Sequence, residues 1–305
     1  MAQDSNDRMV DPRSVLVRPM RPEDVVTASE ITQAAFREVD RATARRTDPE
    51  PTESSPRHRA AWEERTRHFL ATDPAGCWVV EVDAEVTGFA VSYRRDLTWI
   101  LATYAVQPGR QGVGIGTPLL AASLGHSRGC LRGMLAASDD PRAIRRYRLA
   151  GFTLHPQLLL TGTVDRSAIP VVEHVREGTA GDFELMDSID RRLRDAAHGV
   201  DHEVLTRLYR LLVTDRSTGS GYAYVDDGRP VLVAATNRRT ATRLLWEALA
   251  SSEPGTEVSV AHVTAANEWA LDVGIAARLA VRTSGHLALR GMKPPMPYLH
   301  HGSFL

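Results

Sequence analysis

The stretch VQPGRQGVGIGTPLL, residues 106–120, joins a strand-like apolar run to a helix-like one through three glycines at alternate positions. Such a turn leaves main-chain N–H groups unpaired at the positive end of the helix dipole, which favours an anion. Glycine at 112, 114 and 116 permits positive φ and removes the Cβ atoms that would keep a diphosphate away from the main chain. The stretch therefore predicts either a phosphate-binding turn or a tight turn without a ligand.

Two common phosphate-binding motifs do not fit this turn. A P-loop requires Lys followed by Ser or Thr after the glycines, and neither is present. The spacing G-x-G-x-G also differs from the dinucleotide pattern G-x-G-x-x-G, and an antiparallel meander precedes it instead of a parallel β-α-β unit. A metal-assisted nucleotide site and a dinucleotide site are therefore both disfavoured.

The residues around the turn predict an α/β domain with helices on a mixed, half-open sheet. Alternation of apolar residues and turn signals indicate strands at 14–20, 77–83, 85–95, 98–106, 131–138, 152–156 and 158–164. Three-to-four spacing indicates helices at 22–36, 58–72, 117–129 and 139–151. The charged, proline-rich residues 40–57 predict an exposed loop between the first two helices.

A length of 305 residues is ordinary for two domains, and an internal repeat supports that division. The segment beginning at Gly221 parallels the one beginning at Cys77, and residues 257–281 parallel residues 131–154. The two closing segments, expected as hairpins, are RTSGHLALRGM and HPQLLLTGTVD. Because a short polar stretch, DRSAIP, separates the copies, we expect one domain over residues 1–166 and a second over 167–305.

Two motifs in the first half carry a family resemblance. The pattern V-x-P-x-x-Q-G-V-G-I-G-x-x-L-L is similar to the central motif of the GNAT superfamily of N-acetyltransferases, with the defining positions at Gln111, Gly114 and Gly116. A helix of the family, N-x-x-A-x-x-x-Y-x-x-x-G-F, is matched downstream by Asp140, Ala143, Tyr147, Gly151 and Phe152. Only the opening Asn departs from the pattern. The chain thus resembles a tandem GNAT protein, each half a mixed, largely antiparallel sheet flanked by helices.

The resemblance implies an N-acetyltransferase that uses acetyl-coenzyme A. The main chain at Ala105 and Val106 would pair with the pantetheine amides. The diphosphate would be held by the N–H groups of Gln111, Gly112, Val113, Gly114, Ile115, Gly116 and Thr117. Tyr147 would be the general acid that protonates the departing thiolate, although helix spacing alone also allows a core tyrosine.

The resemblance leaves the base and the acceptor open. Candidate bases are Glu81, Asp83, Asp96, a water relay and the carboxylate of Leu305. The acceptor is expected to be a primary amine of a small molecule or a peptide. A non-catalytic acyl-CoA-binding sensor or partner module is the alternative, and it would have no need of a proton donor at Tyr147.

The second half lacks the residues that the resemblance assigns to chemistry. In the position of the glycine turn it reads AATNRRTATRLL, and Ala270 stands where Tyr147 stands in the first half. We therefore expect a degenerate copy that walls the acceptor cleft, mediates a homodimer or stabilises its partner domain.

Composition excludes several function classes. The formal net charge is -1, and 37 basic residues, nearly all Arg, are scattered among 38 acids, so neither a nucleic-acid nor a membrane partner is expected. No apolar run approaches the ~18 residues of a membrane span. The polar N-terminus lacks the apolar region of a signal peptide, which predicts a cytoplasmic protein.

No metal site is expected from the spacing of potential ligands. Cys77 and Cys130 are far apart and outside any CxxC, so they predict buried thiols and not a disulfide or zinc site. His198 and His202 stand four residues apart near two acids, a spacing that can bind metal, but the glycine between them favours simple polar contacts.

Overall fold

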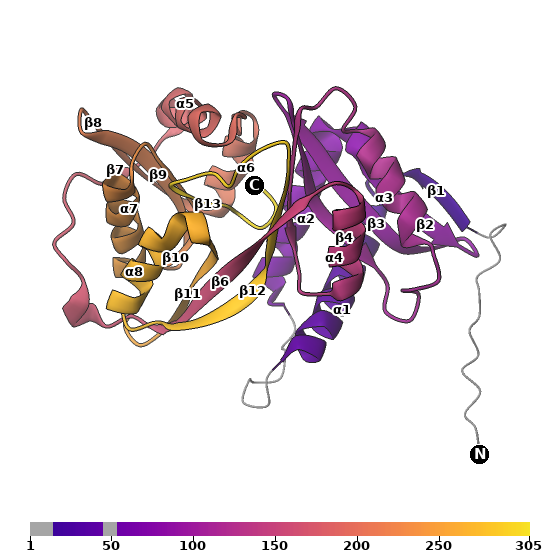
Figure 1. Ribbon diagram of the computed structural model, residues 1–305, viewed down its shortest axis with the longest axis horizontal. Coiled ribbons are helices and arrows are strands. Elements are labelled where there is room, and N and C mark those ends of the chain that lie inside the picture. The colour runs from indigo at the N-terminus through magenta and orange to yellow at the C-terminus, as the bar shows by residue number, and fades with distance from the viewer. Residues whose placement is uncertain (1–14, 45–53) are drawn as a thin grey trace, which may run out of the picture. The chain divides into compact units, whose positions relative to one another are not determined.

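The computed structural model describes residues 15–44 and 54–305 (Figure 1). The polar N-terminal segment 1–14 and residues 45–53 of the predicted loop lie outside the described residues. No helix within the described ranges combines the length and the apolarity that are needed to cross a membrane.

The chain forms two compact units. Unit 1 comprises the described residues up to Tyr93 together with Leu101–Arg128, and unit 2 comprises Arg94–Ile100 together with Gly129–Leu305. These units do not coincide with the predicted domains 1–166 and 167–305, because strands from both halves of the sequence pair with one another in unit 2.

Unit 1 contains a meander of strands in the order β1-β2-β3-β4. The strands are β1 (Val15–Pro19), β2 (Cys77–Val82), β3 (Glu85–Arg95) and β4 (Thr98–Val106), of which β3 and β4 continue into unit 2 at their connecting turn. The pairs β1/β2 and β2/β3 are antiparallel. Asp83 and Ala84 make the turn between β2 and β3, with φ values of 53° and 66°. The predicted strands 85–95 and 98–106 are confirmed at both ends.

Three helices flank this meander, at the places where the sequence predicts them. They are α1 (Asp24–Thr43), α2 (Pro56–Thr72) and α3 (Gly116–Gly125). Ser55 caps α2 by accepting a hydrogen bond from the N–H of His58 at 3.2 Å, and Pro56 fills the first turn. The predicted loop 40–57 is wrong at both ends, since α1 continues to Thr43 and α2 begins at Pro56. The polar last turn of α1 carries Arg41, whose positive charge complements the helix dipole.

Aromatic residues attach α2 to the sheet. The rings of Phe69 and Tyr93 stack with centroids 4.4 Å apart, and Trp62 meets Phe89 edge to face at 5.7 Å. Phe69, Phe89 and Tyr93 are fully buried. Because aromatic side chains bury large apolar areas, these pairs fix α2 on one face of β3.

Both cysteines are free, as expected, but only one is buried. Cys77 is buried at the start of β2, whereas Cys130 is half-buried, so the predicted burial is confirmed for the first and wrong for the second. Burial, with the nearby charge of Asp73, raises the pKa of Cys77 to about 12. Cys77 is therefore a thiol at neutral pH and an unreactive part of the core.

Two β-α-β segments build the first sheet of unit 2. The first consists of β5 (Arg132–Ala137), α4 (Pro141–Leu149) and β6 (Thr153–Thr163); the second consists of β11 (Glu257–Thr264), α8 (Glu268–Ala276) and β12 (Ala280–Arg290). The strand order is β5-β12-β6-β11, with antiparallel pairing throughout. Each segment thus receives a strand of the other between its own two strands, and β6 and β12 run side by side along their length (Figure 1).

The strand order overturns one prediction. The sequence predicts two strands at 152–156 and 158–164 that close the first domain as a hairpin, but β6 is one continuous strand. It does not fold back on itself because β12 and β11 already occupy its two edges. Pro156 pairs with His286 beside a shift in the β6/β12 register, and such an irregularity tolerates the missing N–H. The matching segment in β12 is likewise one strand.

The second sheet of unit 2 has the order β13-β10-β9-β8-β7. Its strands are β7 (Arg176–Glu177), β8 (Arg210–Arg216), β9 (Gly219–Asp226), β10 (Arg229–Ala235) and β13 (Tyr298–Leu299). The helices that accompany it are α5 (Phe183–Arg194), α6 (Asp201–Leu208) and α7 (Arg238–Ala250). Short 3-10 turns occur at Pro74–Gly76, Arg166–Ala168, Ala180–Asp182 and Ala265–Asn267. The core of this region includes Ala223, Val233, Leu244 and Leu245, all fully buried.

The order of elements repeats along the chain. A strand, two helices, three strands, a helix, a strand, a helix and a strand occur from β1 to β6 and again from β7 to β12. In this repeated order β9, the strand that contains Gly221, corresponds to β3. The sequence comparison that sets it opposite the strand at Cys77 is therefore wrong by one strand, because apolar strands of similar length look alike without their partners.

A chain of hydrogen bonds joins β6, β11 and the last residues of unit 2. Gln157 donates from Nε2 to Nε2 of His300 at 2.5 Å, and its Oε1 accepts from Nδ1 of His262 at 3.3 Å. His300 uses Nδ1 to donate to the carbonyl of His301 at 3.0 Å. The rings of His262 and His300 stack 4.2 Å apart, and burial lowers the pKa of His262 to about 4 and that of His300 well below its ordinary value.

The buried histidines His262 and His300 are expected to make the stability of the folded chain depend on pH. Unfolded histidine protonates near pH 6.5, while His262 in the folded chain stays neutral down to about pH 4, so stability present above pH 6.5 is lost as the pH falls toward 4. The loss from His262 between pH 7 and pH 5 is at most about 2 kcal/mol. Urea unfolding at both pH values should show a smaller difference for the variant His262→Gln than for His174→Gln, whose ring is exposed. An equal difference for both variants would exclude this role.

Candidate functional site

The glycine turn lies in unit 1 between the end of β4 at Val106 and the start of α3 at Gly116. Gly112 and Gly114 have φ values of +82° and +93°, in the left-handed region that favours glycine. A Cβ atom built on either would meet nothing within 4 Å, so the space beside the main chain is open. Gly116 is different: it is the first residue of α3 and needs no positive φ, contrary to the expectation for all three glycines.

The turn presents several main-chain donors. The N–H of Arg110 donates to the carbonyl of Gln107 at 3.0 Å, and that of Thr117 donates to the carbonyl of Gly114 at 3.2 Å. Between them, no acceptor for the N–H groups of residues 111–115 is found in the part of the chain that the structure describes. These groups lie immediately before the N-terminus of α3, where the helix dipole favours an anion.

Side chains brace the turn from behind. Gln111 donates from Nε2 to the carbonyl of Val106 at 3.0 Å, and the hydroxyl of Tyr104 donates to the carbonyl of Gly116 at 2.9 Å. Ala105 and Val106 are buried at the end of β4. Gln111 of the motif thus connects the turn to the end of β4, the strand that precedes it.

Tyr147 lies in unit 2 on the short helix α4, and its side chain is only 5% exposed. Asp140 caps this helix by accepting a hydrogen bond from the N–H of Arg142 at 2.8 Å, so the residue that departs from the family pattern still serves as N-cap. Burial alone would raise the pKa of Asp140, but hydrogen bonds from Arg142 and the main chain lower it overall. The helix ends at Leu149, and Gly151, with a φ of +87°, follows its C-cap Ala150.

The structure places the predicted site residues in both units. The turn residues and the end of β4 belong to unit 1, and Tyr147 belongs to unit 2. Within unit 1, Ala105 and Val106 end β4, residues 111–115 form the turn, and Gly116 and Thr117 begin α3, so these residues are neighbours along the chain.

The candidate bases are largely engaged in structural contacts. Glu81 forms an ion pair with Arg18 at 2.6 Å. Asp96 accepts a hydrogen bond from the N–H of Ala197 at 2.9 Å. Asp83 makes the tight turn between β2 and β3 with a positive φ. The carboxylates of Glu81 and Asp96 are therefore held by other groups of the chain, while Asp83 is placed by its turn.

The corresponding turn of the second half is built differently. Asn237 caps α7, accepting from the N–H of Thr240 at 3.0 Å, and its Nδ2 donates to the carbonyl of Thr218. The N-terminus of α7 is therefore occupied by a side chain at the place where the first turn is open. Ala270, in α8, is fully buried and offers no hydroxyl.

A cavity between α1 and α2 in unit 1 could not be found from the sequence. Its volume is about 240 Å³, and its lining includes Phe36, Arg37, Asp40, Arg59, Trp62 and Arg65. Among the lining residues that the structure describes, three guanidinium groups stand against one carboxylate, which gives them a positive balance. The residues come from two helices whose pairing no local pattern encodes.

Part of the first half matches a known protein family by sequence. Residues 37–152 match the family described as Acetyltransferase (GNAT) family. This range contains the glycine turn and ends at Phe152 of the second motif. A sequence search of curated proteins gives no match.

Solved structures resemble nearly the whole chain. A candidate acetyltransferase from Pyrococcus horikoshii has a TM-score of 0.74 and 18% identity, covering 97% of this chain and 96% of its own. A GCN5-related N-acetyltransferase from Sphaerobacter thermophilus has a TM-score of 0.59 and 17% identity, covering 94% and 98%. A third, from Kribbella flavida, has a TM-score of 0.54 and 15% identity, covering 90% and 71%. At these identities the likeness shows the fold, which is the predicted one.

Proposed function

We propose that this chain, whose residues 37–152 match the acetyltransferase (GNAT) family, transfers an acetyl group from acetyl-coenzyme A to a primary amine. The observation that carries the proposal is the open turn at residues 111–115. Its N–H groups have no protein acceptor within the described residues, and no Cβ fills the space beside Gly112 and Gly114. A diphosphate supplies the acceptor oxygens that such a turn requires.

We assign different parts of acetyl-coenzyme A to different residues of the turn and of the strand before it. We assign the diphosphate to the N–H groups of Gln111, Gly112, Val113, Gly114 and Ile115, with Gly116 and Thr117 opening the helix behind them. The N–H of Thr117 already donates to Gly114, so it closes the turn and contributes through the helix dipole. The main chain at Ala105 and Val106 is assigned to the pantetheine arm.

The chemistry is a direct transfer. The amine nitrogen attacks the thioester carbonyl carbon, a C–N bond forms, and the C–S bond breaks to release a thiolate. We assign the phenol of Tyr147 to donate the proton that the thiolate takes up, while water carries away the proton that the amine nitrogen loses. General-acid assistance of this kind contributes about 10²–10⁴ in rate.

The second half is proposed to be a degenerate copy, with the domains at 1–166 and 167–305. Support comes from the repeated order of elements, from the Asn237 cap and from Ala270. The acceptor is proposed to be an amine of a small molecule or a peptide. The positive balance of the α1–α2 cavity disfavours polyamines there, because like charges repel.

A non-catalytic acyl-CoA binder is the second candidate. The same open turn supports it, since binding needs no proton donor. The two functions separate in one assay: the full chain is mixed with acetyl-coenzyme A and a panel of amines, and free thiol is measured. Amine-dependent thiol release supports the transferase, whereas binding of acetyl-coenzyme A without release under any amine supports the binder.

The turn itself is tested by a matched pair of glycine variants. Gly114 and Gly109 both have positive φ, +93° and +77°, and open space beside them, but only Gly114 lies among the unpaired N–H groups. Gly114→Ala is expected to weaken acetyl-coenzyme A binding about tenfold, equivalent to ~1.4 kcal/mol. Gly109→Ala should change it less than twofold. Calorimetric titration decides, and equal affinities for the two variants would remove the turn from the binding site.

A further inference from the structure

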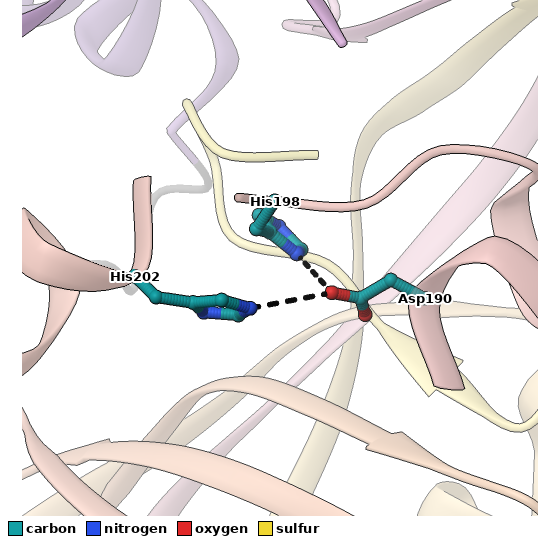
Figure 2. A group of neighbouring side chains, drawn as sticks. All are labelled: Asp190, His198 and His202. Carbon is teal, nitrogen blue, oxygen red and sulfur yellow. Dashed lines mark hydrogen bonds and ion pairs between the residues drawn. The ribbon is translucent and has the colours of Figure 1, made fainter. Parts of the chain in front are cut away.

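A buried cluster of histidine and aspartate lies in unit 2, away from the residues assigned above. Asp190 is on α5, His198 is in the connection to α6, and His202 is on the first turn of α6. All three side chains are fully buried. Figure 2 shows both imidazole rings directed at the same carboxylate oxygen of Asp190.

The donor atoms of the cluster converge on one point. His198 Nδ1 lies 2.7 Å from Oδ2 of Asp190, and His202 Nε2 lies 3.7 Å from the same oxygen. One ligand atom from each of the three residues lies within 4.8 Å of the others. A fourth donor, Oδ1 of Asp187, lies 3.2 Å from His202 Nε2. Ligands of a tetrahedral ion with bonds near 2.0–2.1 Å are ~3.3 Å apart, between these values.

The hydrogen bonds around His202 leave its Nε2 facing carboxylates. Nδ1 lies 3.1 Å from the hydroxyl of Tyr224, and this hydroxyl donates to the carbonyl of His202 at 3.5 Å. In the form with a metal ion on Nε2, Nδ1 would carry the hydrogen and donate it to this tyrosine oxygen. Nε2 is buried and lies 3.2 Å from Oδ1 of Asp187 and 3.7 Å from Oδ2 of Asp190, so it points between two carboxylates. A divalent cation in this position would take ligands from the imidazole and from both carboxylates.

Neighbouring groups hold the cluster in place. The hydroxyl of Tyr222 donates to the second oxygen of Asp190 at 2.6 Å, and the N–H of Gly199 donates to Asp187 at 2.9 Å. Such outer hydrogen bonds orient metal ligands. Arg194, also buried, donates to the carbonyl of Ala197 and to a main-chain oxygen of Leu305, the residue whose carboxylate was a candidate base.

The turn between the histidines explains why they meet. Gly199 adopts a φ of +57°, and α6 begins only at Asp201, so the two rings approach from a turn and a helix and not from one helix face. Their centroids are 5.3 Å apart. The glycine that disfavours a metal site in the sequence is thus the residue that brings the rings together.

We propose that Asp187, Asp190, His198 and His202 bind one divalent cation of the zinc type. Two imidazoles and two carboxylates form a donor set that Zn²⁺ accepts, and the carboxylates balance its charge. Because three of the ligands are fully buried, the ion is structural and ties α5 to α6. It requires no part of the acetyl-transfer chemistry.

The test uses the full chain after removal of metal by a chelator. Zinc is added alone, and bound zinc is measured by elemental analysis with the melting temperature. We expect one zinc per chain, a melting temperature that increases with zinc concentration, and a Co²⁺ complex with the visible absorption of a tetrahedral site. Unchanged melting with substoichiometric zinc and no Co²⁺ absorption would show that the cluster is a hydrogen-bond network only.

Variants assign the binding to these residues. His202→Gln should abolish stoichiometric zinc binding, and Tyr224→Phe, which keeps every ligand, should weaken it about 10–100-fold. His174→Gln removes an exposed histidine of the same unit and should bind like the unaltered chain. Full zinc binding by His202→Gln, or loss in His174→Gln, would overturn the assignment. The Co²⁺ spectrum of the unaltered chain decides if His202→Gln does not fold.

Discussion

A chain shortened to residues 1–166 is expected to lose its cooperative unfolding transition. Truncation removes β12, which pairs with β5 on one edge and β6 on the other, and it also removes β11 from the far edge of β6. Leu287, Ala288 and Leu289 of β12 are fully buried, and each buried leucine contributes roughly 2 kcal/mol. With the lost strand pairing, this approaches the roughly 5–15 kcal/mol that stabilise a whole domain. Circular dichroism during heating measures the result.

Two controls accompany the truncation. Co-expression of residues 167–305 should restore a folded complex, because it returns β12 and β11. Within the full chain, Leu289→Ala should cost about 2–5 kcal/mol, whereas Val281→Ala, on the same strand but 41% exposed, should cost less than about 1 kcal/mol. A fragment 1–166 that melts cooperatively as a monomer would contradict the requirement for the exchanged strand.

Substitution of Tyr147 by Phe is expected to lower kcat on the order of 10²-fold or more. The ring of Tyr147 is buried in α4, so Phe keeps the packing and removes only the hydroxyl that the proposed mechanism uses as acid. The KM for acetyl-coenzyme A should change less than twofold, because the turn that binds it is unaltered. Thiol release measured at saturating amine gives both constants.

The matched control is Tyr298→Phe. Tyr298 is another buried tyrosine of unit 2, and its hydroxyl has no hydrogen-bond partner among the described residues. Removing that hydroxyl should leave kcat within about twofold, because no hydrogen bond is lost. If Tyr147→Phe retains its fold and its full turnover, the general-acid role is withdrawn, while binding of acetyl-coenzyme A at the turn stands or falls by the glycine variants.

Local patterns were sufficient for most of the secondary structure. The limits of β3 and β4 are predicted to the residue, since turn residues with positive φ bound them and apolar alternation fills them. The glycine turn is predicted with them, because its parts are contiguous. Where the prediction fails, as at Thr43 and in β6, the competing signals were a polar helix end and a proline within a strand.

The cluster at Asp190 shows where local patterns stop. Its histidines are visible as a spacing of four, but Asp190 and Asp187 look like ordinary acids of an amphipathic helix. Only the packing of α5 and α6 reveals that donor atoms of Asp190, His198 and His202 lie within 4.8 Å of one another, with Asp187 beside His202. Burial of these side chains makes an unbalanced charge costly, and no local sequence pattern predicts that burial.

The sequence alone determined the family resemblance, the position of the glycine turn and the loss of glycine and tyrosine in the second half. Each of these depends on residue types at short, fixed spacing, which the chain carries without its partners. The tertiary structure decided that β12 separates β5 from β6. Strand neighbours distant along the chain are chosen by the burial of whole faces, and apolar strands with equivalent patterns are interchangeable until the sheet is assembled.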